Sequence, residues 1–205
     1  VLYKSNIIIM KHLSKYLMYL LIVYGLVSCN NKEKKPSNKN SEQSEFSESL
    51  KYNIDTTGIS VLWTAYKFTN KVGVSGIFST YTFETKNTFG TVENILNKSK
   101  LLIPTATVNS SNSIRDFKLD TYFFKAFNTS EIRGTIIKAK ESEGIINLKM
   151  NRRSKKIPFI YSVEKDTIRL FTNLSLTYWK AEKALKTLNV ECFDLHKGSD
   201  GASKL

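Results

Sequence analysis

Residues 189–205, NVECFDLHKGSDGASKL, gather side chains of the types that bind metals or perform nucleophilic catalysis. The stretch contains Cys192, Asp194, His196 and Asp200. A thiolate beside an imidazole can act as a nucleophile, and thiolate, imidazole and carboxylate together are zinc ligands. The rest of the sequence decides between these chemistries and a structural role for the segment.

The supply of cysteine and histidine excludes most of that chemistry. The chain has two Cys and two His, and His12 lies in an N-terminal segment that we expect to be removed. His196 is then the single imidazole, so a zinc site with several histidine ligands is excluded. The sequence has no GxSxG, P-loop or GxGxxG motif, and no second base or oxyanion motif accompanies Cys192. We predict no catalytic residues, no metal and no cofactor, and catalysis by Cys192 and His196 is the weakest alternative.

The N-terminus is organised like a secretory signal. Lys11 and Lys15 precede an uncharged apolar run at 16–26. This run is too short to span a bilayer comfortably, since a spanning helix needs about 20 apolar residues. We therefore expect residues 1–28 to be a signal peptide. Residues 1–9 precede the first methionine and read as a start-site artefact.

The residues after the apolar run indicate an envelope lipoprotein. Leu-Val-Ser-Cys at 26–29 resembles a bacterial lipobox, which implies cleavage before Cys29 and lipidation of its thiol. Two or three acyl chains, each contributing about 0.8 kcal/mol per buried CH₂, hold a protein stably on a membrane. Residues 29–50 are rich in Asn, Ser, Lys and Glu and predict a flexible tether, so the folded domain is expected at 51–205. We expect an outer-membrane lipoprotein that faces the periplasm.

The charge of the chain indicates a basic surface. The formal net charge is +13, and the Lys and Arg residues are scattered except for RRSKK at 152–156. Nucleic-acid binding usually requires a clustered basic stripe, so no nucleic-acid partner is expected. The surface can instead lie against anionic lipid, where each Lys or Arg contributes about 1 kcal/mol. The oligomeric state is left open.

Most of the folded part has the composition and spacing of β-strands. Aromatic and β-branched residues are frequent, and Gly and polar turns separate the apolar runs. The last four runs are joined by short polar turns, which predicts an antiparallel meander. Strands are predicted at 60–68, 72–84, 100–111, 131–140, 144–151, 156–164 and 167–175.

Three segments have helical spacing instead. Val92, Ile95 and Leu96 form a short amphipathic turn, and 113–127 reads as a short helix with Ser113 as its N-cap. Residues 178–189 predict a further helix, whose apolar face consists of Ala181, Ala184, Leu185 and Leu188. The sum is a mainly β fold, a barrel or a two-sheet sandwich, with two or three short helices.

Four segments resemble the YceI-like family of lipocalin-like barrels. They are LWTAYKFTNKVGVSGIFSTYTF (62–83), SIRDFKLDTYFF (113–124), IPFIYSV (157–163) and LNVECFDLHKGSDGASK (188–204). The resemblance implies an antiparallel β-barrel whose apolar tunnel holds a polyisoprenoid, with a binding role rather than a catalytic one. Relatives often have Gly in the turn at 151–154, and they continue past the last Ser-Lys with a Trp-containing strand. The resemblance therefore implies that the closing strand is absent here, through truncation or an incomplete barrel.

The resemblance and the aromatic composition together select candidate ligand-binding residues. The candidates for an apolar tunnel are Trp63, Phe78, Tyr81, Phe83, Phe123, Phe124, Phe159 and Tyr161. The same side chains fit a filled core equally well. Arg115 and Asp116 are candidates for the tunnel mouth or a ligand head group, but adjacent opposite charges at a helix start also act as capping residues.

The expected function follows from these assignments. We expect a lipid-anchored envelope protein that binds an isoprenoid or other long apolar ligand in its barrel. The alternative is a non-catalytic interaction module with a filled core. In either case Cys192 reads as a small buried residue, Asp194 and His196 as hydrogen-bonding loop residues, and Gly198 and Gly201 as turn residues.

Overall fold

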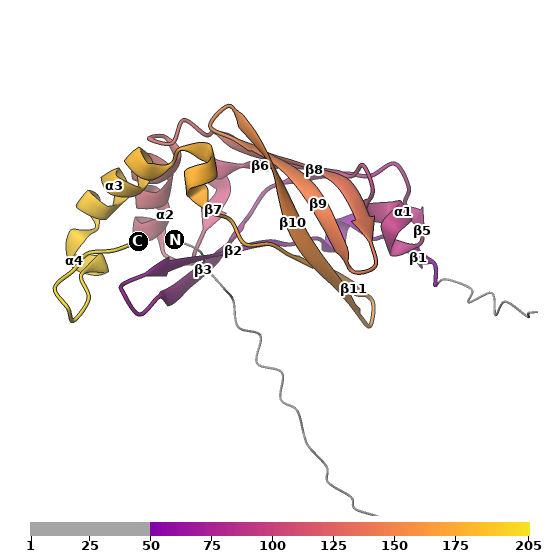
Figure 1. Cartoon of the computed structure of the whole chain (residues 1–205), viewed down its shortest axis with the longest axis horizontal. Coiled ribbons are helices and arrows are strands. Elements are labelled where there is room, and N and C mark those ends of the chain that lie inside the picture. The colour runs from indigo at the N-terminus through magenta and orange to yellow at the C-terminus, as the bar shows by residue number, and fades with distance from the viewer. Residues whose placement is uncertain (1–49) are drawn as a thin grey trace, which may run out of the picture. The chain divides into compact units, whose positions relative to one another are not determined.

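The computed structural model describes residues 50–205, and within them the fold is mainly β, as predicted (Figure 1). The predicted signal peptide at 1–28 and the predicted lipidation site Cys29 lie outside the described residues, as does the predicted tether except for its last residue. None of the helices in residues 50–205 is long and apolar enough to cross a bilayer.

Six strands pair in an antiparallel sheet, and the four that lie between residues 131 and 171 form the predicted meander. From one edge to the other the six strands are β11 (Thr167–Phe171), β10 (Arg153–Glu164), β9 (Glu143–Met150), β8 (Glu131–Lys140), β6 (Lys100–Pro104) and β4 (Thr82–Glu84). A smaller sheet consists of β2 (Val61–Lys67), β3 (Val72–Phe78) and β7 (Val108–Asn109). The strands predicted at 72–84 and 100–111 each break into two strands that join different sheets. A two-stranded ribbon pairs β1 (Tyr52–Asn53) with β5 (Phe89–Gly90).

The six-stranded sheet curls without closing on itself. Among the described residues, no strand pairing joins it to the three-stranded sheet. Its edges are β11 and β4, and the edges of the smaller sheet are β2 and β7. The described strands therefore form an open, barrel-like shell.

Short helices cover the two ends of the curled sheet. One end has α1 (Val92–Leu96), and the other has α2 (Ser113–Lys118), the π-helical turn η3 (Leu119–Phe124), η4 (Leu176–Trp179), α3 (Glu182–Glu191) and α4 (Phe193–His196) (Figure 1). Two 3-10 turns, η1 (Thr56–Gly58) and η2 (Thr105–Thr107), lie in the connections.

Two details of the predicted helices are wrong. The N-cap of α2 is Asn112, not Ser113, because the extended backbone of Asn112 lets its side chain accept from the Arg115 backbone N–H at 2.9 Å. The helix predicted at 178–189 is two helices, η4 and α3. Lys180 separates them because it takes a left-handed conformation with φ 62°.

Two turns of the meander, Glu141–Ser142 and Asn151–Arg152, place both residues in left-handed backbone conformations without glycine, and the third does so at Lys165. Asn151 and Arg152, between β9 and β10, have φ of 44° and 58°, as type I′ hairpin turns require. Asn151 is held there by two bonds, since its N–H donates to Thr129 Oγ1 and its Nδ2 donates to the Trp179 carbonyl, both at 2.8 Å. These contacts stabilise a turn in which relatives of the resembled family often have glycine.

Glycines opposite aromatic residues shape the inner faces of both sheets. Gly76 lies directly opposite Trp63, and a Cβ on Gly76 would lie 2.6 Å from the indole ring. Gly144 lies opposite Phe159, and a Cβ there would overlap the phenyl ring. Each ring therefore occupies the space over the facing glycine, which has no side chain.

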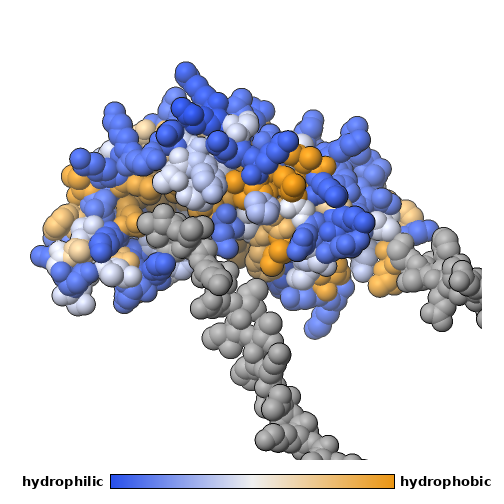
Figure 2. All heavy atoms as spheres, viewed as in Figure 1, coloured by the Kyte–Doolittle hydropathy of each residue, from blue (hydrophilic) through white to orange (hydrophobic). Residues whose placement is uncertain are grey.

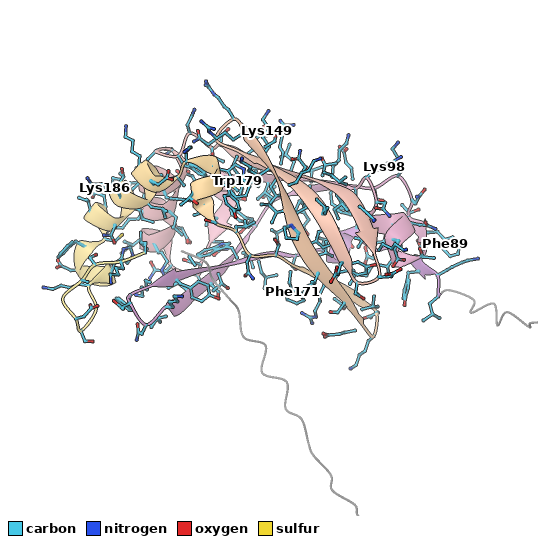
Figure 3. All side chains as sticks on the ribbon, in the orientation of Figure 1. Phe89, Lys98, Lys149, Phe171, Trp179 and Lys186 are labelled. Carbon is cyan, nitrogen blue, oxygen red and sulfur yellow. The ribbon has the colours of Figure 1, made fainter. Side chains whose placement is uncertain are left out.

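The core divides into two clusters that we name by position. The helical-end cluster joins both sheets to η3, η4 and α3. Within it, Trp179 at the end of η4 packs against the large sheet, where its Nε1 donates to the Leu148 carbonyl at 3.2 Å (Figure 3). The α1-end cluster consists of Val92, Leu96, Ile136, Ala139, Phe159 and Tyr161. Ile146 packs against both clusters and connects them.

A methyl group at position 144 tests the ring-on-glycine packing. We expect Gly144→Ala to lower the free energy of unfolding by about 1–3 kcal/mol, because the Phe159 ring must leave its place. Urea denaturation measures the change. Gly73→Ala is the matched strand control, since its nearest neighbour atom would lie at an ordinary 3.4 Å. A Cβ at position 144 would also lie 2.5 Å from the Lys138 carbonyl oxygen, so adding Phe159→Leu to Gly144→Ala should restore only part of the lost stability. An equal effect of Gly144→Ala and Gly73→Ala would contradict the packing argument.

Candidate ligand-binding site

From Ile157 onward the inner face of β10 is an apolar row, whereas Arg153 and Lys155 occupy the same face nearer the start of the strand. Ile157, Phe159 and Tyr161 are buried, while Pro158 and Ile160 between them are exposed. Alternate residues of a strand point to opposite faces, so Val163 continues the inner row. The row runs from the helical-end cluster, which contains Ile157, to the α1-end cluster.

The register extends this row onto the edge strand β11. Leu170 lies opposite Tyr161, and Ile168 lies opposite Val163. Directly opposite residues share one face of a sheet, so Leu170 and Ile168 both belong to the inner face. Ile168 packs against the α1-end cluster, but Val163 and Leu170 remain 38% and 41% exposed. The inner face is therefore apolar and partly accessible along β11.

The predicted tunnel residues fall into three groups. Trp63, Tyr81, Phe78, Phe123 and Phe124 belong to the helical-end cluster, and Phe159 and Tyr161 to the α1-end cluster. Phe83 is partly buried and belongs to neither cluster. By register it lies opposite Leu101, which packs on the helical-end cluster.

The aromatic side chains of the helical end pack on one another. The ring centroids of Phe123 and Phe124 are 5.0 Å apart, and those of Phe78 and Phe124 are 6.1 Å apart. The polar atoms of Trp63 and Tyr81 are also hydrogen-bonded. Trp63 Nε1 donates to the Ile77 carbonyl at 3.2 Å, and Tyr81 Oη donates to the Ile59 carbonyl. These contacts are those of a packed interior.

Tyr161 carries the one strongly polar contact of the α1-end cluster. Its hydroxyl donates to Glu93 Oε1 of α1 at 2.6 Å. Burial, together with this bond, raises the pKa of Tyr161 to about 12. The same bond lowers the pKa of Glu93 below its ordinary value. The pair therefore consists of a neutral phenol and a carboxylate at neutral pH, and it ties α1 to the inner face of β10.

Arg115 and Asp116 have different environments. Asp116 Oδ1 accepts from the Ser110 N–H at 2.8 Å and from Ser110 Oγ at 2.6 Å, so its carboxylate ties the preceding loop to α2. The Arg115 side chain is exposed. Asp116 thus braces the loop before α2 and does not cap the helix, whose N-cap is Asn112, and the head-group role of both residues stays a prediction.

Cys192 and His196 lie close along the chain in an environment that disfavours nucleophilic chemistry. Both are buried. Burial raises the pKa of the Cys192 thiol, and it lowers the pKa of His196, with the charges of Lys67 and Lys118 adding to the effect on the imidazole. The thiol is thus protonated and the imidazole neutral at neutral pH, whereas reactive cysteines have lowered pKa values. His196 Nδ1 is hydrogen-bonded to Asn189 Oδ1 at 3.2 Å.

The rest of the C-terminal segment has a structural role. Asp200 accepts a hydrogen bond from Thr69, and the Phe68 N–H donates to the Lys204 carbonyl at 3.1 Å, so the segment holds the β2–β3 turn. Gly201 has φ 75°, as its predicted turn role requires. Asp194 is exposed. Residues 50–205 contain no group of three or more His, Cys, Asp or Glu side chains that could hold a metal ion.

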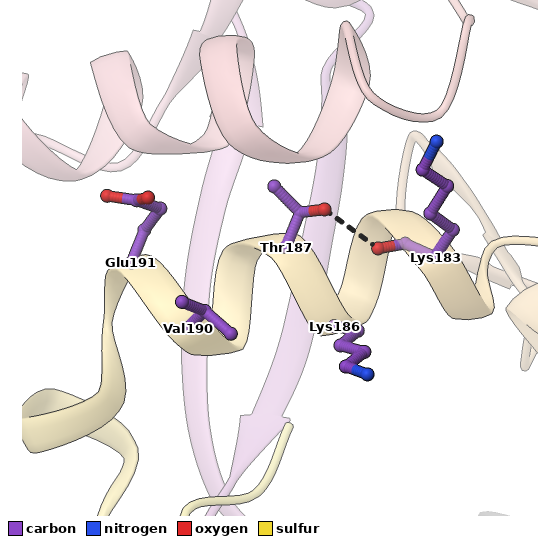
Figure 4. Close-up of a pocket in the computed structure, with 5 residues that line it drawn as sticks. All are labelled: Lys183, Lys186, Thr187, Val190 and Glu191. Atoms are coloured by element: carbon purple, nitrogen blue, oxygen red, sulfur yellow. Dashed lines mark hydrogen bonds between the residues drawn. The ribbon is translucent and has the colours of Figure 1, made fainter.

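A surface hollow that the sequence did not predict lies on α3. Its volume is about 410 Å³, and its lining includes Lys183, Lys186, Thr187, Val190 and Glu191 (Figure 4). Thr187 Oγ1 donates to the Lys183 carbonyl at 3.0 Å within the helix. None of the predicted tunnel residues lines it, so the apolar inner face is the better candidate for a ligand site.

Val163, Ile168 and Leu170 are further candidate site residues, which the sequence reasoning missed. The alternation of Ile168 and Leu170 with polar residues in TIRLF was the available signal, because it marks one apolar face on a strand.

Comparison with solved structures returns proteins of similar fold. A polyisoprenoid-binding domain from Saccharophagus degradans matches with a TM-score of 0.47 and 15% identity, over 65% of this chain and 83% of that one. The YceI protein of Campylobacter jejuni matches with a TM-score of 0.47 and 21% identity, over 68% and 88%. BcnA of Burkholderia cenocepacia matches with a TM-score of 0.41 and 12% identity, over 54% and 73%. The matches include a protein named YceI, the family that the sequence resembles.

No family model and no curated protein matches the chain. At TM-scores below 0.5 the likeness to solved structures carries no argument for function. The functional argument therefore rests on the residues of this chain.

Removing the Tyr161 hydroxyl tests the tie between α1 and the inner face. We expect Tyr161→Phe to lower the free energy of unfolding by about 1 kcal/mol at neutral pH, because Glu93 loses a charge-assisted hydrogen bond. The folded-state pKa of Glu93 is lowered from 4.5, so this stability is present above pH 4.5 and is lost as pH falls through the folded-state value.

The difference in stability between Tyr161→Phe and the parent should therefore shrink in acid. Denaturation at neutral and acidic pH measures it. Tyr178→Phe, at a half-exposed tyrosine, is the control and should show no such pH dependence. The role given to Glu93 would be contradicted if Tyr161→Phe lowered the free energy of unfolding by the same amount at neutral pH and at a pH well below 4.5.

Proposed function

We propose that this chain is a YceI-like protein that binds a long apolar molecule of the isoprenoid class against the inner face of its curled sheet. Two observations support the proposal. The four resembling sequence segments fall on the strands and helices that surround this face. The face itself presents alternating apolar side chains along β10 and β11, and two of them, Val163 and Leu170, remain accessible.

The accessibility of the β11 edge is the observation that carries the proposal. A hydrocarbon chain needs no specific partner, only a continuous apolar lining from which water is displaced. Each CH₂ that leaves water contributes about 0.8 kcal/mol. Val163 and Leu170 lie on the same face as buried Phe159 and Tyr161, so an apolar chain along them would extend an existing core.

The packing at the two ends supports a narrower proposal for where the ligand binds. The helical end is filled by phenylalanine rings at close distances, which favours the filled-core alternative there. The accessible inner side chains lie on the β10–β11 hairpin instead. We therefore place the ligand along that hairpin and towards the α1 end, with Phe159 and Tyr161 as its floor.

The second part of the proposal concerns location. We propose that the mature chain is an envelope lipoprotein anchored through Cys29, on the outer membrane and facing the periplasm. The apolar run at 16–26, its two preceding lysines and the Leu-Val-Ser-Cys motif support this. A membrane-anchored position would keep the protein next to its apolar ligand.

A charge placed on the accessible inner face tests the ligand site. We expect Leu170→Lys to weaken the binding of dansyl-labelled farnesol by roughly tenfold or more, because a buried ammonium beside hydrocarbon costs at least about 1.4 kcal/mol. Fluorescence titration measures the affinity. Phe171→Lys is the matched control, because Phe171 is the next residue and pairs with Ile160 on the opposite face.

Three results bear on the ligand proposal. Parental binding with selective loss in Leu170→Lys supports it. Equal loss in Leu170→Lys and Phe171→Lys, or no uptake of the probe by the parent and no lipid in solvent extracts of the purified protein, would refute it.

Replacing the predicted lipidated residue tests the anchor. We expect Cys29→Ser to abolish incorporation of radiolabelled palmitate in bacterial cells, while Cys192→Ser, at the other cysteine of the chain, keeps it. Gel fluorography of the expressed protein shows the label. Palmitate incorporation that survives in Cys29→Ser would rule out this anchor.

A further inference from the structure

Cationic side chains gather on the outer face of the six-stranded sheet. One row across four strands reads Lys100, Thr135, Asn147 and Lys156, and the neighbouring row places Arg133 directly opposite Lys149. Lys138 lies opposite Ile145 on the same face. We name the set Lys100, Arg133, Lys138, Lys149 and Lys156 the basic face, and all five side chains are exposed.

The arrangement has an electrostatic cost inside the folded protein. Adjacent strands are about 4.8 Å apart, and like charges directly opposite one another destabilise a sheet. Arg133 and Lys149 form such a pair. Arg133 has a partner in Glu131 at 2.5 Å, and Lys100 has a distant one in Glu84 at 3.9 Å. Among the described residues, Lys138, Lys149 and Lys156 form no ion pair.

Protection of a sheet edge does not explain these lysines. Lysine often guards exposed edge strands against pairing with other chains. Lys138 and Lys149 lie on β8 and β9, which have a hydrogen-bonded strand on each side. These two lysines therefore project outward from the middle of the sheet. An external anionic partner can offset the repulsion among the cations there.

Exposed apolar side chains adjoin the basic face on the same side of the sheet. Ile145 lies opposite Pro158, and Ile160 lies opposite Phe171. Ile145, Ile160 and Phe171 are 39%, 47% and 52% exposed. Figure 2 shows hydrophilic and hydrophobic residues side by side over this sheet. Glu131 and Glu143 lie on this face too, but its cations outnumber them, so the outer face combines net positive charge with accessible apolar surface.

We propose that the outer face of β8, β9 and β10 docks on an anionic lipid surface. Such a surface suits both features, because its phosphates attract clustered Lys and Arg while its acyl boundary accepts apolar side chains. A purely polyanionic partner would explain the cations but leave Ile145, Ile160 and Phe171 exposed. The docking is independent of the Cys29 anchor and of the ligand on the inner face.

The helical end is the competing docking surface. Ile114 and Phe117 on α2 and Val190 on α3 are more than 60% exposed. The charges there nearly balance, because α3 carries Lys183 and Lys186 together with Glu182 and Glu191, and α2 carries Arg115 and Lys118 together with Asp116. Charge complementarity to an anionic membrane therefore favours the basic face.

Local tryptophan reporters in the full chain distinguish the two surfaces. Ile160→Trp reports on the outer face, Phe117→Trp on the helical end, and Leu62→Trp is the control at a residue that is 73% exposed on β2. Native Trp63 and Trp179 are partly or fully buried in every variant. We expect brominated lipid in phosphatidylglycerol vesicles to quench the reporter at 160 at least about threefold more than those at 62 and 117. In phosphatidylcholine vesicles this difference should vanish.

Charge reversal tests the cause of docking in the Ile160→Trp background. Lys149→Glu with Lys156→Glu should remove most of the quenching at position 160. Lys183→Glu with Lys186→Glu makes the same change in net charge on α3 and should leave the quenching unchanged. Because quenching is local, it reports docking even where a lipid anchor already holds the chain on the vesicle.

The proposal would be overturned if the tryptophan at 160 were not quenched on phosphatidylglycerol vesicles, or were quenched no more than the tryptophan at 62. Stronger quenching of the tryptophan at 117, or equal quenching at 160 on phosphatidylcholine and phosphatidylglycerol vesicles, would also overturn it. Equal loss from both charge reversals would also overturn it. Phe171→Trp reports on the same face and replaces Ile160→Trp where circular dichroism shows that the latter does not fold. Concentration-dependent blue shifts without vesicles would identify a second copy of the chain as the occupant instead.

Discussion

The inner face depends on the packing of the Phe159 ring against Gly144 across β10 and β9. A side chain at position 144 would displace the ring, so the pair fixes the register of the two strands. A slip of one residue would turn Ile157, Phe159 and Tyr161 outward and bring Lys156, Pro158 and Ile160 inward. Because β10 pairs with both β9 and β11, the same register also determines that Leu170 faces inward.

The fixed register gives the sheet two faces with different chemistry. The inner face is apolar and joins the helical-end and α1-end clusters through Ile146. The outer face carries the basic face beside Ile145, Ile160 and Phe171. The proposed ligand and the proposed membrane surface would thus lie on opposite sides of strands only one layer thick.

Much of this fold could be predicted from alternating residues and polar turns, but several details could not. The strands of the meander and the buried face of Ala181, Ala184 and Leu188 were predictable because their periodicity is local. The breaks at Lys180 and the cap at Asn112 depend on backbone conformations that other residue types also adopt. Packing of Phe123 on Phe124, and the exposure of Leu170, depend on contacts between distant segments. The Cys192–His196 segment has active-site residue types, but its burial is a tertiary property.

Photo-crosslinking most directly tests the central claim that the inner face binds an apolar chain. A diazirine-bearing geranylgeraniol would be irradiated with the full chain, and the modified peptides mapped by mass spectrometry. The account predicts adducts on inward residues of β10 and β11, namely Phe159, Tyr161, Val163 and Leu170, that excess unlabelled geranylgeraniol suppresses. Adducts confined to the outer face or to α3, or adducts that competition does not suppress, would contradict it.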